Sequence, residues 1–236
     1  MKKTLETIHL CKNYGQIQAV RDFNFSAVKG EIIALLGPNG AGKSTFMNMI
    51  TGFLSPTSGK ILVNSEDIFL APLKTKACIG FLPEGAPIYP DMSVEMFLKY
   101  MAELRGVTQQ NLKHAIEMAN IENVLTQKVE TLSKGYLRRV GFAQSVLADP
   151  DILLLDEPTD GLDPNQKEHM QQLICSMRND KTILISTHLL DEAEEICSRI
   201  IIINHGKIMI DGSIEEILIK TKTKSLKAAF QKLTKD

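Results

Sequence analysis

A glycine-rich segment between two apolar patterns constrains this chain more than any other feature. Residues 37–45 read GPNGAGKST, which fits the pattern G-x-x-x-x-G-K-[S/T]. The segment follows the unbroken apolar run Ile32–Leu36, which is typical of a strand covered on both faces. It precedes apolar residues at helical spacing, Phe46, Met49 and Ile50. A strand that turns through glycines into a helix predicts an α/β fold with an anion site at the turn.

The residue types in this segment suit the binding of phosphate. Glycines allow successive backbone N–H groups to point inward, and the helix N-terminus adds a partial positive charge. Lys43 is expected to reach the terminal phosphates of a nucleotide, and the Ser44 hydroxyl to bind Mg²⁺. The expected cradle consists of Gly37, Pro38, Asn39, Gly40, Ala41, Gly42, Lys43, Ser44 and Thr45. The alternative, a glycine-rich turn that binds nothing, is disfavoured by the strand and the helix on either side.

Two acidic residues follow a second apolar run. Residues 152–155 read ILLL, and Asp156, Glu157, Pro158 and Thr159 come next. Because ligands lie at the carboxyl ends of strands in open α/β sheets, both carboxylates are expected beside the phosphate cradle. Asp156 is expected to hold Mg²⁺, and Glu157 to orient or deprotonate an attacking water. A lone Asp-Glu pair is also compatible with a surface turn, so the predicted role of this pair depends on the phosphate cradle beside it.

A third apolar run ends in a histidine. Residues 182–185 read TILI and lead into Ser186, Thr187 and His188. His188 is therefore expected at the same sheet edge, within reach of the terminal phosphate. A histidine taken singly is more often structural than catalytic, so its predicted catalytic role depends on this placement.

The stretch between residues 89 and 148 changes from strand to helix patterns. Ser93 and Thr108 are expected to cap two helices, and Ser133 a third that follows the segment TLSKGY at 131–136. We predict one domain in which residues 1–88 and 149–236 form the binding core and residues 89–148 an inserted helical subdomain.

Positive charge gathers at the start of the third of these helices. Lys134, Arg138 and Arg139 oppose the helix dipole there, at a cost of about 0.3–1 kcal/mol each. Either an anion approaches this helix end and relieves the conflict, or the three side chains are solvated cations. The sequence leaves both alternatives open.

The order of these motifs resembles the nucleotide-binding subunit of an ABC transporter. L-S-x-G-x stands shortly before D-E-P-T, and G-L-D and S-T-H follow, so the likeness covers essentially the whole chain. Residues 80–84 and 132–136 are similar to those of the ATPases of drug, sodium and polysaccharide exporters, including gliding-motility-type complexes. The resemblance implies a P-loop NTPase core with a mostly parallel sheet, an N-terminal antiparallel β-subdomain and an inserted helical signature subdomain. It also implies ATP and Mg²⁺ as ligands and ATP hydrolysis coupled to transport.

The resemblance further implies a head-to-tail dimer, homomeric or heteromeric, with ATP between its subunits. Each ATP would lie on one subunit's cradle and face Ser133 and Gly135 of the other. Tyr14 matches the aromatic residue that stacks on adenine, Asp163 the D-loop, and His188 the switch histidine. A role as helix N-cap alone would also explain Asp163. Without the resemblance, Tyr14 would be predicted as a core residue at a strand end.

Two departures from the family pattern accompany this likeness. Lys134 and Tyr136 stand where the commonest form has Gly and Gln, while Ser133 and Gly135 are retained. Glu84 stands where the family usually has Gln, in the loop that senses Mg²⁺ and contacts the membrane subunit. Glu84 is expected to contact the metal shell and to face the membrane partner.

Composition weighs on the remaining alternatives. The 236 residues carry a formal net charge of -1, without the basic excess of a dedicated nucleic-acid binder. No apolar stretch approaches the roughly 20 residues that span a bilayer. An integral membrane permease is therefore expected as a separate chain, with this one at the cytoplasmic face. A soluble ABC ATPase acting on nucleic acid or ribosomes is the alternative. Such a protein usually has two cassettes, a coiled-coil insertion or zinc-binding cysteines. A further alternative is a P-loop small-molecule kinase, which leaves residues 131–136 unexplained.

Overall fold

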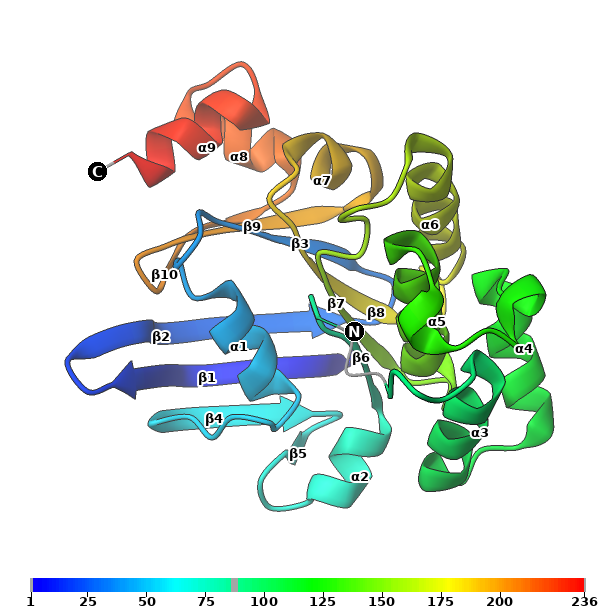
Figure 1. The fold of residues 1–236 in the computed structure, drawn as a ribbon. Coiled ribbons are helices and arrows are strands. Elements are labelled where there is room, and N and C mark those ends of the chain that lie inside the picture. Colours follow the sequence, from blue (N-terminus) through cyan, green and yellow to red (C-terminus); the bar gives the residue numbers. More distant parts are fainter. Residues whose placement is uncertain (1, 86–88, 236) are drawn as a thin grey trace.

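Two sheets form the frame of the molecule. Residues 2–85 and 89–235 are described in a computed structural model of the chain (Figure 1). One sheet is antiparallel and four-stranded, in the order β2-β1-β4-β5. Its strands are β1 (Lys3–Tyr14), β2 (Ile17–Val28), β4 (Ser58–Val63) and β5 (Glu66–Asp67). The alternation of buried Phe23, Phe25 and Ala27 with more exposed neighbours confirms the half-buried strand expected from the sequence.

The second sheet is six-stranded and mostly parallel, in the order β10-β9-β3-β8-β7-β6. Only its edge strand β10 pairs antiparallel. Its strands are β3 (Ile32–Leu36), β6 (Ile79–Leu82), β7 (Ile152–Asp156), β8 (Thr182–Ser186), β9 (Arg199–Asn204) and β10 (Lys207–Gly212). Every residue of β3, β7 and β8 is buried, as the continuous apolar runs predicted. The predicted P-loop NTPase fold class is thus confirmed.

Helices cover both sheets. They are α1 (Lys43–Ile50), α2 (Pro72–Ala77), α3 (Val94–Arg105), α4 (Gln109–Ala119), α5 (Lys134–Val146), α6 (Pro164–Ser176), α7 (Leu190–Ile196), α8 (Ile214–Thr221) and α9 (Leu226–Thr234), with short 3₁₀ turns at Glu122–Val124 and Val129–Thr131. The expected caps are confirmed, because Ser93, Thr108, Ser133 and Asp163 each accept a hydrogen bond from a backbone N–H three residues on.

Helix α1 lies between the two sheets and shares its core with both (Figure 1). Phe46 packs edge-on against Phe23 and Phe25 of β2, with ring centroids 5.0 and 6.0 Å apart. In the same apolar cluster Met47 and Met49 join Leu35 of the parallel sheet. The start of α1, and with it the glycine-rich loop, is therefore fixed from two sides.

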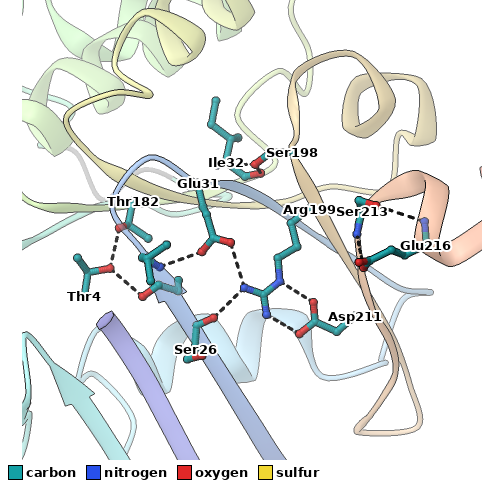
Figure 2. A network of polar contacts seen from close by, with 12 residues as sticks. Thr4, Ser26, Glu31, Ile32, Thr182, Ser198, Arg199, Asp211, Ser213 and Glu216 are labelled. Carbon is teal, nitrogen blue, oxygen red and sulfur yellow. Dashed lines mark hydrogen bonds and ion pairs between the residues drawn. The ribbon is translucent and has the colours of Figure 1, made fainter. Parts of the chain in front are cut away.

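Polar contacts also join the two sheets (Figure 2). The Arg199 guanidinium on β9 donates to both carboxylate oxygens of Asp211 on β10, each at 2.6 Å. It also donates to Glu31 at 3.2 Å and to the carbonyl of Ser26 on β2 at 2.9 Å. Because a bidentate arginine–carboxylate pair is geometrically specific, this network holds β2 against β9 and β10.

The helical part of the chain packs on one end of the parallel sheet. Helices α3, α4 and α5 share one apolar cluster with residues of β6, β7 and β8. A side chain at Gly80 on β6 would collide with the carbonyl of Ser145 on α5, so strand and helix approach closely. The predicted boundary between residues 88 and 89 adjoins residues 86–88, which lie outside the described residues.

Candidate active site

Four loops converge at the carboxyl edge of the parallel sheet. Because β3, β6, β7 and β8 run parallel, the segments that follow them emerge at the same edge. They line one cavity of about 700 Å³. The predicted site residues in its wall are Gly37, Pro38, Asn39, Gly40, Gly42, Lys43, Ser44, Thr45, Glu84, Asp156, Glu157 and His188. A larger hollow of about 1020 Å³ near α4 contains none of the predicted site residues.

The glycine-rich loop has the curled backbone that phosphate binding needs. Gly40 and Gly42 have φ values of 80° and 108°, in the left-handed region that favours glycine. A side chain at Gly42 would also strike the carbonyl of Ala19. Ala41 is buried beneath the loop and does not line the cavity. The loop leads directly into α1, whose N-terminus points its free N–H groups toward the cavity.

Lys43 is the cation of this cavity. Its Nζ donates to the carbonyls of Gly37 at 2.6 Å and Pro38 at 3.2 Å. Burial lowers the pKa of Lys43, while the negative charges of Glu157, Asp156 and Glu84 raise it. The ammonium group is thus held by its own loop, facing three carboxylates.

Glu157 is fixed through both its backbone and its side chain. Its φ of 51° places it in the left-handed region, and its N–H donates to the carbonyl of Ser186 at 2.8 Å. The Nδ1 atom of His188 lies 2.9 Å from Oε2 of Glu157, within hydrogen-bonding distance. The two predicted catalytic groups therefore touch.

Burial raises the pKa of both carboxyl groups in the cavity. For Glu157 the hydrogen bond from His188 is the largest opposing effect and lowers the pKa. For Asp156 burial is again the first cause, and the positive charges of Arg138 and Lys43 oppose it. A carboxylate with a raised pKa is a stronger base, which suits proton abstraction near neutral pH.

A buried glutamate that the sequence did not predict joins the loops that follow β7 and β8. Glu192 on α7 is 1% exposed and accepts hydrogen bonds from Thr159 at 2.8 Å and Thr187 at 2.7 Å. Thr159 follows Glu157, and Thr187 precedes His188. Glu192 lies on the same helix face as Ile196, which follows one turn later. A charged residue is unexpected on that apolar face, and this is the signal that the sequence offers.

Arg138 corrects the expectation of an anion-facing or solvated cation. It is 6% exposed, and all five of its N–H groups donate to backbone carbonyls. The acceptors belong to Pro83 and Glu84 after β6, and to Asp156 and Glu157 after β7. Arg138 is neither solvated nor directed at an anion, because α5 carries it on its buried face.

Besides Ala41, four predicted site residues lie outside the cavity wall. They are Tyr14, Ser133, Gly135 and Asp163. Ser133 is exposed at the start of α5, and Tyr14 is 49% exposed at the end of β1, which argues against the alternative of a core residue at Tyr14. A single chain thus brings together the cradle, the carboxylates and the histidine, but not these four residues.

The cavity fits a phosphate ligand with a hard cation. Ser44, Glu84 and Asp156 all line it and present hydroxyl or carboxylate oxygens, the donors that Mg²⁺ prefers. Among residues 2–85 and 89–235, no group of three or more His, Cys, Asp or Glu side chains forms a metal site by itself. A cation here would share its ligands with the phosphates.

Comparisons with known proteins identify the family. The family model described as "ABC transporter" matches residues 20–160. The chain is 33% identical to the ABC transporter ATP-binding protein NatA of Bacillus subtilis (strain 168), over 91% of this chain and 89% of NatA.

Solved structures agree with this match. The ATP-binding subunit of an ABC transporter superimposes with a TM-score of 0.92 at 27% identity, covering 98% of this chain and 100% of that one. The dimeric structure of MJ0796, a bacterial ABC transporter cassette, superimposes with a TM-score of 0.79 at 26% identity, covering 89% and 98%. With its phosphate loop, paired carboxylates and histidine at one sheet edge, the chain belongs to the ABC transporter family, as an ATP-binding subunit that hydrolyses ATP.

Proposed function

We propose that ATP is hydrolysed in this cavity with Glu157 as general base, and that closure of two such subunits drives a separate membrane subunit. The observation that carries the proposal is the convergence of Lys43, Glu157 and His188 in one cavity wall. Each comes from a loop that follows a different strand of the same parallel sheet, so the fold itself assembles the group.

The phosphates would be held by the loop of residues 37–45. Its backbone N–H groups and the start of α1 favour an anion, and Lys43 would exchange its loop carbonyls for the β- and γ-phosphate oxygens. Ser44, Asp156 and Glu84 would hold Mg²⁺, directly or through water. When bound, the ion supplies positive charge that neutralises the phosphate oxygens.

Glu157 would take the proton of the attacking water. The water oxygen forms a bond to the γ-phosphorus while the bond to the β–γ bridging oxygen breaks, and ADP and phosphate result. The proton passes to the Glu157 carboxylate, whose pKa is raised by burial. His188 donates to Oε2 of Glu157 and so orients the carboxylate.

A second subunit would complete the site. Ser133 and Gly135 lie at the N-terminus of a 13-residue helix without an acidic residue in its first turn, an end that favours an anion. Because this end lies outside the chain's own cavity, the phosphate it meets would belong to a partner subunit. We assign Asp163 to the same interface and Tyr14 to the adenine. The dimeric state of the MJ0796 cassette supports this arrangement.

An integral membrane subunit would dock on exposed apolar side chains close to β6. Phe53, Leu70 and Leu73 are 76%, 85% and 91% exposed, and the ring of Phe53 lies 6.1 Å from that of Phe81 on β6. The loop with Glu84 follows β6. In the part of the chain that the structure describes, no helix has the length and apolarity to cross a bilayer. From the family to which the chain belongs, we place it on the cytoplasmic face of a membrane, bound to a permease. Its family branch, an exporter ATPase, follows from the likeness at residues 80–84 and 132–136.

The variant Glu157→Gln tests the proposal. It keeps the shape and hydrogen bonding of the side chain but removes the proton acceptor, so hydrolysis should fall by about 10²–10⁴-fold while ATP still binds. Mg²⁺ and ATP should then convert the variant to a stable dimer, measured by light scattering with size exclusion. Normal hydrolysis by Glu157→Gln would reject the base, and a variant that stays monomeric with ATP bound would reject the dimer.

A further inference from the structure

Arg138 joins three parts of the molecule that the proposed function uses. The residue belongs to α5, which starts at Ser133 and Gly135. Its Nη1 donates to the carbonyls of Pro83 and Glu84, each at 2.7 Å. Its Nη2 donates to the carbonyl of Asp156 at 2.5 Å and also to that of Glu157, which accepts from Nε at 3.1 Å as well.

These acceptors lie where two neighbouring strands separate. β6 and β7 pair in parallel up to Leu82 and Leu155, and the four carbonyls come directly after this ladder. Backbone carbonyls that leave a sheet lose their ladder partners and need other donors when buried. The planar guanidinium, with five N–H groups in a fixed geometry, satisfies both segments at once.

The contact bears directly on the conformation of Glu157. A φ of 51° is uncommon for a residue other than glycine and costs on the order of 1 kcal/mol or more. The surroundings must therefore hold it. The N–H of Glu157 is bound by Ser186 and its carbonyl by Arg138, so the peptide units on both sides of the residue are fixed.

Arg138 achieves this without entering the cavity. It does not line the cavity wall, and its acceptors are carbonyls rather than carboxylates. The side chains of Glu84, Asp156 and Glu157 stay available for ligand, proton and metal. If Arg138 were paired with a carboxylate, one of these three side chains would not be available.

We propose that Arg138 is a positioning residue that holds Glu157 in its left-handed conformation and couples it to the Glu84 segment. A shift of α5 or of the Glu84 loop then reaches the catalytic carboxylate through one side chain. This inference rests on the proposed role of Glu157 as the base.

The test compares two neighbouring arginines in the purified full-length chain. Arg138→Lys keeps the charge but has three N–H donors, so it cannot bridge four carbonyls on two segments. We expect kcat for ATP to fall at least about tenfold, because a small misplacement of a catalytic group costs up to about 10²-fold. The KM and the Kd for ATP should stay within about twofold of the wild type.

Arg139→Lys is the matched control. Arg139 is on the same helix, but its guanidinium lies over the Tyr136 ring at 5.8 Å and donates to Asn120 at 3.4 Å. Its replacement should leave kcat unchanged. If Arg138→Lys unfolds, Arg138→Gln, which leaves no buried charge, takes its place. Unfolding of both variants, judged by circular dichroism, would assign Arg138 to stability alone and overturn the inference.

Double variants separate this inference from the proposed function. If Arg138 acts through Glu157, adding Arg138→Lys to Glu157→Gln should not lower the residual single-turnover rate further. An additive loss, an Arg138→Lys rate equal to that of Arg139→Lys, or an equal loss of kcat and ATP affinity would overturn it. Normal hydrolysis by Glu157→Gln alone would instead reject the role of Glu157 as base.

Discussion

Two regions of the molecule carry clear sequence motifs, the carboxyl edge of the parallel sheet and the start of α5. They differ in whether one chain brings their predicted site residues together. At the sheet edge, Lys43, Glu157 and His188 line one cavity, and the last two touch each other. At the start of α5, Ser133 is exposed, and the Ser133 side chain contacts the N–H of Tyr136 in its own helix. The first region is assembled by one chain. The second presents Ser133 outward, so its proposed function is tested by asking what needs a second subunit.

Replacing the cavity's lysine should have the largest effect on the region that one chain completes. Lys43→Ala removes the charge aimed at the β- and γ-phosphates, so ATPase activity should fall by about 10²–10³-fold and ATP binding should weaken. A coupled ATPase assay and titration with a fluorescent ATP analogue measure both. Lys60→Ala, at an exposed lysine on β4, is the control. Undiminished turnover of Lys43→Ala would contradict the assignment.

The next prediction addresses the start of α5. Ser133→Arg places a large side chain where the partner's phosphate is expected, and overfilling a packed contact costs about 1–3 kcal/mol. ATP-driven dimerisation should weaken by roughly 30-fold, while ATP binding to the monomer stays nearly intact.

Analytical ultracentrifugation with and without ATP measures that effect. Ser93→Arg removes an equivalent helix cap from α3 and serves as the control. If Ser133→Arg lost ATP binding as a monomer, Ser133 would belong to the cavity of its own chain and the comparison would fail.

A pH profile sharpens the description of the cavity. The hydrogen bond from His188 lowers the pKa of Glu157, so His188→Ala should raise that pKa further. Since the base acts when deprotonated, the acid limb of kcat should move to higher pH, and kcat at its optimum should fall by about tenfold.

His188→Gln retains an amide donor and should keep the acid limb closer to that of the wild type. An acid limb that does not move in His188→Ala would show that the contact at 2.9 Å has no part in tuning the base.

The smallest effect is expected at Tyr14. Stacking of an aromatic ring on a base contributes about 1 kcal/mol, so Tyr14→Ala should weaken ATP binding by roughly fivefold with kcat unchanged. Isothermal titration calorimetry measures the affinity, and Tyr14→Phe, which keeps the ring, should bind as the wild type does. Equal affinities for all three proteins would remove Tyr14 from the adenine site.

Most of the fold could be predicted because its signals are local. Unbroken apolar runs marked the buried strands, and Ser93, Thr108, Ser133 and Asp163 marked the helix starts by a residue type and its immediate neighbours. The cavity wall was likewise predictable, since parallel strands deliver their following loops to one edge.

The supporting residues could not be predicted in the same way. Arg138 binds carbonyls 54 and 55 residues before it and 18 and 19 residues after it. Glu192 joins Thr159, 33 residues away, to Thr187. A charge on a helix is predicted to be solvated unless its buried partners are known. Those partners are backbone or hydroxyl groups from distant segments, which leave no pattern in the sequence.

The packing of Gly135 bears on how a mutational scan of this chain should be interpreted. A Cβ at this position would meet the amide of Gln166 on α6, within the same subunit, and that amide is the far end of a flexible side chain that can turn aside. A substitution at 135 therefore displaces an intramolecular neighbour before an intersubunit contact is tested. A loss of function at Gly135 in a library would combine the two effects. The exposed Ser133, two residues earlier, is the position at which the scan reports on assembly.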